Sequence, residues 1–106
     1  MDDSYQNGVT AVAGGGQSAK PNIYATVTRV TTVATAADSV TLPQAAPGLR
    51  YKVINKAAAN SLNVFPLAGD AINALGVNAA FALAATKSVE FISVAPGIWD
   101  TFPIAP

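Results

Sequence analysis

Apolar and polar residues alternate along several short segments of the chain. Residues 49–55 place Leu49, Tyr51 and Val53 on one face and two basic residues on the other. Residues 88–94 repeat the pattern, with apolar side chains at every second position. A period of two is typical of a strand that buries one face. Both segments are therefore predicted to be strands of a sheet with one covered and one open side.

Turn-forming residues divide the rest of the chain into short pieces. Pro47-Gly48 and Pro96-Gly97 favour tight turns, and residues 56–59 are expected to form a hairpin connection. Short strands that recur at roughly 8–12-residue intervals between such turns are typical of a β-sandwich or barrel. The predicted fold is all-β, an antiparallel β-sandwich or barrel of jelly-roll type with an extended N-terminal arm. The expected strands cover residues 23–33, 39–42, 49–55, 61–65, 71–73, 79–83, 88–94 and 98–102.

The first 22 residues differ from the remainder. They are rich in glycine and polar residues, including the triplet at 14–16, and such sequence is typical of disordered termini. The alternative, which we favour, is an arm that becomes ordered against a neighbouring chain. We expect residues 1–22 to form this arm and residues 23–106 to form the β domain. The residues through which the arm is expected to contact its partner are Tyr5, Val9, Val12 and Lys20.

Composition argues against catalysis and for assembly. The chain has no His and no Cys, so the usual general base near neutral pH, the usual thiolate and the usual zinc ligands are all missing. We expect no enzyme activity, no cofactor and no metal. Hydrophobic residues make up 51% of the 106 residues and charged residues only 11%, with a net charge of zero. A chain with so little charge tends to self-associate, although much of its apolar content is alanine.

The carboxylates and the glycine triplet do not form a recognisable catalytic motif. A pair of carboxylates is the minimum for glycoside hydrolysis, but most acidic residues here stand beside turns, where Asp commonly binds backbone N–H groups. The triplet at 14–16 lacks the Lys-Ser/Thr that follows a phosphate-binding loop. The acidic positions considered are Asp2, Asp3, Asp38, Asp70, Glu90 and Asp100.

The aromatic residues have two interpretations. They can be core side chains, which the strand alternation already explains, or a platform on which sugars stack. We favour the core, and Trp99 is the residue for which the choice is most open, because it stands beside Asp100 near a turn. The other aromatic residues considered are Tyr51, Phe65, Phe81, Phe91 and Phe102.

Charge and hydropathy narrow the expected partners. Arg50, Lys52 and Lys56 cluster weakly and are balanced by acidic residues elsewhere, so we expect no nucleic-acid binding, which needs an excess of cations. No apolar run approaches the roughly 20 residues that span a bilayer, so we expect no membrane among the partners of this chain. The acidic N-terminus lacks the positive start of a signal peptide, and we expect the chain to bypass the general secretory route.

Residues 39–102 carry a series of short motifs. They run from Val-Thr-Leu-Pro at 40–43 and Pro-Gly at 47–48 to Val-Ile-Asn at 53–55 and Asn-Ser-Leu-Asn-Val-Phe-Pro at 60–66. Gly-Asp-Ala-Ile-Asn follows at 69–73, then Lys-Ser-Val-Glu-Phe-Ile-Ser-Val at 87–94 and Gly-Ile-Trp at 97–99. This series resembles the small β-modules of tailed-bacteriophage virion proteins, which occur in capsid decoration (cement) proteins, head fibres and tail fibres.

The resemblance implies a structural protein of the virion. Such modules are commonly homotrimers with a shared core, for which Leu62, Val64, Phe91 and Ile92 are the expected residues. The implied partners are other copies of the chain and the major capsid protein, and the implied location is the capsid exterior after synthesis in the host cytoplasm. The chain's length favours a decoration protein. The alternative is a head-fibre or tail-fibre module that recognises host-surface carbohydrate.

Overall fold

Short strands make up the regular structure of this protein. The computed structural model describes residues 5–13, 16–17, 22–35, 38–73 and 75–102, and these contain nine strands and no helix. No helix in those ranges is long and apolar enough to cross a membrane. The strands are β1 (Tyr5–Thr10), β2 (Val27–Thr32), β3 (Ser39–Thr41), β4 (Arg50–Asn55), β5 (Leu62–Phe65), β6 (Ala71–Ile72), β7 (Phe81–Leu83), β8 (Ser88–Ala95) and β9 (Ile98–Phe102).

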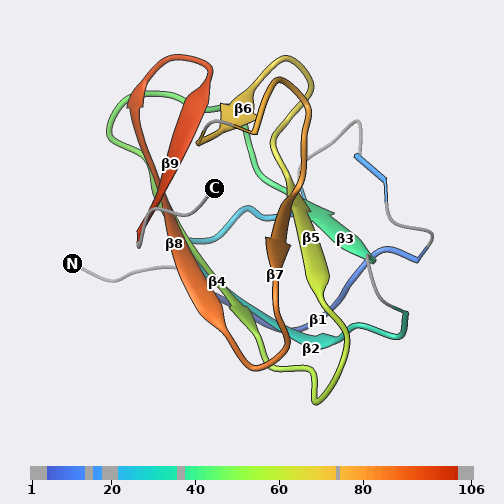
Figure 1. Ribbon diagram of the computed structural model, residues 1–106. Helices are drawn as coiled ribbons and strands as arrows, with labels where there is room; N and C mark the ends of the chain where they lie inside the picture. Colours follow the sequence, from blue (N-terminus) through green and yellow to red (C-terminus); the bar gives the residue numbers. More distant parts are fainter. Residues whose placement is uncertain (1–4, 14–15, 18–21, 36–37, 74, 103–106) are drawn as a thin grey trace.

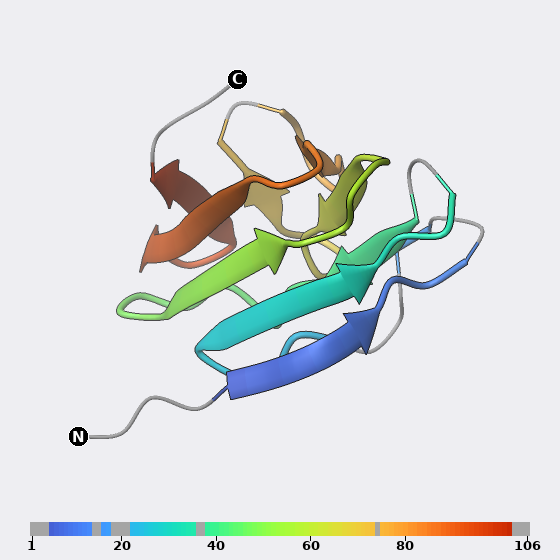
Figure 2. The same cartoon turned by 90° about the horizontal axis from the view of Figure 1, so that it is seen from below.

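The strands form two sheets, as in a β-sandwich (Figure 1). The larger has the order β1-β2-β4-β8-β9-β6 and the smaller the order β3-β5-β7. Figure 2 shows β1, β2, β4 and β8 side by side. The predicted all-β, sandwich-like fold is confirmed, but the sheets are mixed rather than antiparallel. The pairs β1–β2, β2–β4, β3–β5 and β6–β9 are parallel.

The parallel pairs follow from the path of the chain. From β2 to β8, consecutive strands alternate between the two sheets, so the chain crosses the sandwich at each connection. Strands that return to the same sheet after such a crossing can lie parallel, whereas a tight hairpin gives only antiparallel neighbours. Residues 56–59, expected to be a hairpin connection, instead lead from β4 in the larger sheet to β5 in the smaller one.

The two Pro-Gly turns lie where the sequence predicts them. Pro96-Gly97 joins β8 to the antiparallel β9 in the hairpin of the larger sheet. Gly97 has a φ of 77°, a left-handed conformation that glycine adopts without strain. Pro47-Gly48 turns the chain into β4, and there the φ of Gly48 is 93°.

One hydrophobic core fills the space between the sheets. Phe91 of β8 and Phe81 of β7 meet edge to face across the sandwich, with ring centroids 5.7 Å apart. Leu62, Val64 and Phe91 are fully buried in this core. The structure therefore assigns these three side chains to the interior of a single chain, which corrects the expectation that they form a core shared between chains. Ile92 is half-buried and has the opposite orientation along β8.

The described part of the N-terminal segment belongs to the larger sheet. β1 pairs in parallel with β2 at the sheet edge, with register shifts along the pair. Beyond it, Val12 forms a bridge to Ser39 of β3, so the chain passes from one sheet to the other here too. Residues expected to be an extended arm thus contact the chain's own β domain. Contact of this segment with another chain stays a prediction.

The expected arm contacts are exposed to different degrees. Tyr5 is 77% exposed and Val12 is 43% exposed, whereas Val9 is half-buried against the core. Lys20 lies outside the described residues. Of the three described arm contacts, Tyr5 is therefore the side chain most available to a partner.

Candidate functional site

The outer face of the larger sheet carries most of the exposed charge of the described residues. Strand alternation turns Val53 and Phe91 inward and leaves Arg29, Arg50 and Lys52 exposed on the side away from the core. We call this side of β2, β4 and β8 the outer face. Its side chains are Val27, Arg29, Thr31, Arg50, Lys52, Ile54, Ser88, Glu90, Ile92 and Val94.

The strand register sets a regular arrangement on the outer face. Lys52 lies opposite Val27, Arg29 lies opposite Ile54, and Arg50 lies opposite Ile92. Each of these cations is therefore next to an aliphatic residue on the neighbouring strand. In the antiparallel Arg50–Ile92 pair the Cβ atoms are expected to lie about 4.5–5.5 Å apart. The members of the two parallel pairs are also neighbours across adjacent strands, so a partner that touches one member can touch the other.

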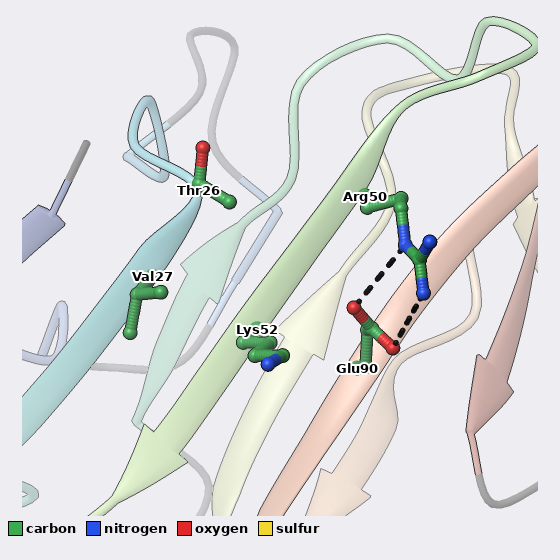
Figure 3. A pocket seen from close by; sticks show the side chains of 5 residues that line it. All are labelled: Thr26, Val27, Arg50, Lys52 and Glu90. Carbon is green, nitrogen blue, oxygen red and sulfur yellow. Dashed lines mark hydrogen bonds and ion pairs between the residues drawn. The ribbon is translucent and has the colours of Figure 1, made fainter. Parts of the chain in front are cut away.

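Glu90 forms an ion pair with Arg50 rather than with the lysine across from it. The register puts Glu90 opposite Lys52, yet Arg50 Nε lies 3.4 Å from Glu90 Oε2 and Arg50 Nη2 lies 3.4 Å from Glu90 Oε1 (Figure 3). A guanidinium fork contacts both oxygens of a carboxylate, which a lysine ammonium does not match. Lys52 forms no ion pair within the described part of the chain.

A shallow pocket lies at this ion pair. Its volume is about 270 Å³, and Thr26, Val27, Arg50, Lys52 and Glu90 line it (Figure 3). Pockets for drug-sized ligands and cofactors run from about 300 to 1,000 Å³ and are mostly apolar. This pocket is smaller and has charged walls, so it suits a single polar side chain better than a cofactor.

Two carboxylates of the described residues, those of Asp38 and Asp70, bind backbone N–H groups. Asp38 Oδ2 accepts a hydrogen bond from the Thr35 backbone N–H at 3.2 Å, within its own turn. Asp70 Oδ2 accepts one from the Ala45 backbone N–H at 2.8 Å, linking two distant loops. Both residues are buried. The turn role expected for Asp38 is thus confirmed, and Asp70 serves a longer-range contact. Asp2 and Asp3 lie outside the described residues.

The part of the chain described here contains no group of three or more acidic, His or Cys side chains that could hold a metal ion.

No protein-family model matches the chain, and no curated protein and no solved structure matches it either.

Substitution of Asp70 tests its structural role. Asp70→Ala removes the acceptor for a buried backbone N–H, and a hydrogen bond to a charged group contributes about 1.5–3 kcal/mol. We expect the free energy of unfolding to fall by about that amount in urea denaturation. Asp70→Asn retains a side-chain oxygen and is expected to cost less. Equal losses from the two variants would contradict the assignment, because both would then act through something other than the acceptor.

Trp99 is a core residue in the structure. It is fully buried in β9 and meets Tyr51 edge to face, with ring centroids 5.7 Å apart. The core interpretation is confirmed for this side chain, and a sugar platform on Trp99 is excluded in this fold. The exposed aromatic side chains of the described residues are Tyr5 and Tyr24, at 77% and 76%.

Sequence reasoning found only part of the outer face. The alternation in residues 49–53 already turns Arg50 and Lys52 away from the core. Arg29 joins them only because β2 and β4 are parallel neighbours, and no local pattern indicates that pairing. The ion pair between Arg50 and Glu90 likewise spans 40 positions in the sequence.

Proposed function

We propose that this chain is a bacteriophage capsid decoration protein that binds the assembled shell as a trimer and stabilises it. The motifs at residues 39–102 support the virion setting. A binding role is supported by a surface that exposes large apolar side chains. The alternative, a fibre module that binds host carbohydrate, loses its main aromatic candidate because Trp99 is buried.

The observation that carries the assembly role is the position of the exposed apolar side chains. Tyr5 and Tyr24 stand at the β1 side of the larger sheet. Tyr5 is the first residue of β1, and the Tyr24 backbone N–H donates a hydrogen bond to the side chain of the next residue, Gln6. Val77, 65% exposed, stands beside β6, and Val94, 70% exposed, lies near the end of β8, the strand that pairs with β9. Val77 bridges Ala71, which is paired with Ile98 of β9. We call these pairs of side chains the β1 edge and the β6 edge.

Two different apolar patches at opposite sides of one sheet favour a ring. A two-fold dimer uses the same patch on both chains, whereas a ring joins one patch to a different patch on the next chain. The β1 edge of one copy would contact the β6 edge of the next, and three copies would close the ring. Within the described residues β1 pairs only with β2, and such a strand edge in other proteins often pairs with another chain.

Shell stabilisation follows from binding that requires assembly. A protein that binds only the assembled shell shifts the equilibrium towards that state by mass action. Three linked binding surfaces raise the avidity beyond that of one. The proposed trimer therefore acts as a clamp across neighbouring capsid subunits and needs no chemical step.

Oligomeric state gives the first test. Light scattering with size-exclusion chromatography is expected to give three times the chain mass of 10.7 kDa. The double variant Tyr5→Ser/Tyr24→Ser and the double variant Val77→Ser/Val94→Ser are each expected to be monomers. A mixture of the two variants retains one intact interface between unlike chains and is expected to give a dimer without a ring.

The matched control is Asn7→Ser, an exposed position on the same strand as Tyr5, which is expected to leave the trimer intact. A wild-type monomer, or a dimer broken by only one of the two double variants, would contradict the ring. Shell binding is tested separately by sedimenting the wild-type chain with purified shells of the virus that encodes it. Absence from the pellet would contradict the decoration role.

A further inference from the structure

The cations of the described residues are concentrated on one side of the protein. Arg29, Arg50 and Lys52 are exposed on the outer face. Lys56 follows the last residue of β4 and Lys87 precedes the first residue of β8, and both are exposed. All five thus lie on β2, β4 and β8 or within one residue of their ends.

The carboxylates do not balance this charge at the surface. Asp38 and Asp70 are 3% and 6% exposed and bind backbone N–H groups. The Glu90 side chain is 15% exposed and is held by Arg50. Within the described residues, the outer side of the larger sheet therefore carries Arg29, Arg50 and Lys52 against Glu90 and the half-buried Asp100, because Asp38 and Asp70 are buried.

Lys52 is the cation available to a ligand in the pocket. Both oxygens of Glu90 are engaged by Arg50, whose side chain is 62% exposed. A carboxylate entering the pocket would meet the Lys52 ammonium and the open side of Arg50 (Figure 3). Beside it, Val27 offers an aliphatic contact.

We propose that the outer face docks an extended acidic segment of a partner protein, in which acidic and apolar side chains alternate. One carboxylate enters the pocket at Lys52, and the apolar side chains contact the aliphatic residues that lie opposite the cations. This inference rests on the proposed function, in which the partner is the capsid protein. Apart from Val94, which lies at the end of the outer face on β8, it uses side chains outside the β1 and β6 edges, so a trimer presents three such faces.

A nucleic acid fits this surface less well than an acidic polypeptide. Phosphate backbones need a dense excess of cations, whereas Glu90 and the half-buried Asp100 share the outer side of the sheet with the three cations. Val27, Ile54 and Ile92 interrupt the charge at regular positions. Aliphatic contacts between cations favour a ligand that is itself part apolar.

The probe is a fluorescein-labelled hexapeptide in which Asp and Leu alternate, followed by anisotropy at low salt with the full-length chain. We expect saturable binding that weakens as salt rises, because salt screens exposed charges. Lys52→Glu is expected to weaken binding by about tenfold, since it places a like charge in the pocket. The matched control Lys87→Glu makes the same charge change at an exposed site outside the pocket and is expected to change the Kd by less than about twofold.

Two further probes test whether the outer face recognises the charge of the peptide and whether it prefers a polypeptide to a nucleic acid. The peptide with Asn in place of Asp has the same shape without charge and is expected not to bind. A single-stranded DNA oligonucleotide is expected to bind more weakly than the acidic peptide. The proposal is overturned if the Asn peptide binds equally well, if Lys87→Glu matches the loss in Lys52→Glu, or if the oligonucleotide binds more tightly.

Shell binding separates this inference from the proposed function. If wild-type chain sediments with shells and Lys52→Glu sediments equally, the acidic docking site is wrong while the decoration role stands. If wild-type chain does not sediment, the decoration role fails, and the peptide measurements alone decide the chemistry of the outer face. Equal unfolding midpoints of the two variants in urea ensure that the comparison is between folded chains.

Discussion

Replacing Trp99 with alanine is expected to lower the free energy of unfolding by about 3–5 kcal/mol. The side chain is the largest that is fully buried, and it packs on Tyr51 in edge-to-face geometry. It also lies opposite Ile72 in the parallel β6–β9 pair, so it fills the core beneath one end of the larger sheet. Truncation leaves a cavity that the surrounding strands fill only in part. Urea denaturation, with the midpoint and slope fitted together, measures the loss.

Trp99→Phe is the matched control for this prediction. The indole Nε1 is buried and has no hydrogen-bond partner in the described residues, so phenylalanine removes a polar group that gains nothing there. It also retains an aromatic ring against Tyr51. We expect a loss below about 1.5 kcal/mol. A loss equal to that of Trp99→Ala would contradict the packing assignment. Unchanged stability in Trp99→Ala would contradict the burial of this side chain in the core.

The sequence predicted the strands well where one side of a strand is buried and the other is open. β4 and β8 alternate as expected, with Val53, Val89 and Phe91 buried and Arg50 and Lys52 exposed. The strand expected over residues 23–33 is shorter in the structure, where β2 covers Val27–Thr32. Its first residues are instead engaged by the side chain of Gln6, a contact that β propensity does not indicate.

The sequence could not predict which strands lie next to one another, and the reason is physical. Alternation specifies which face of a strand is buried, but not which strand lies beside it. A short Pro- or Gly-containing connection serves equally for a hairpin and for a crossing between sheets about 10 Å apart. The chain uses the second route between β2 and β8, which makes β2 and β4 parallel neighbours and brings Arg29 beside the basic residues of β4.

The same ambiguity explains the wrong assignment of the shared core. Leu62, Val64 and Phe91 are apolar and regularly spaced, which identifies a buried face but not the molecule that covers it. In the structure the opposite sheet of the same chain covers them, so they are fully buried without a partner. Assembly must therefore use side chains that remain exposed in one chain, such as Tyr5, Tyr24 and Lys52.

Replacing Gln6 with alanine is expected to lower the free energy of unfolding by about 2–4 kcal/mol. Gln6 lies on the edge strand β1 but is 8% exposed. Its Oε1 accepts hydrogen bonds from the backbone N–H groups of Tyr24 and Ala25, at 2.9 and 3.3 Å, and from the Thr28 hydroxyl at 2.9 Å. Its Nε2 donates to the Asn22 carbonyl at 3.1 Å. Truncation leaves these groups without a partner, and buried unpaired groups are costly.

Two variants separate this network from general effects on β1. Asn7 lies on the same strand as Gln6, and its Oδ1 accepts an exposed hydrogen bond from Arg29 of β2. Asn7→Ala removes this bond and is expected to lower the free energy of unfolding by less than about 0.5 kcal/mol. Gln6→Glu keeps the acceptor but loses the donor to Asn22, and is expected to fall between wild type and Gln6→Ala. Amide hydrogen exchange is expected to accelerate in β1 and at Tyr24 and Ala25 in Gln6→Ala. Because β1 is an edge strand with shifted register, a loss as small as that of Asn7→Ala would mean that the backbone ladder, not Gln6, holds β1 on the sheet.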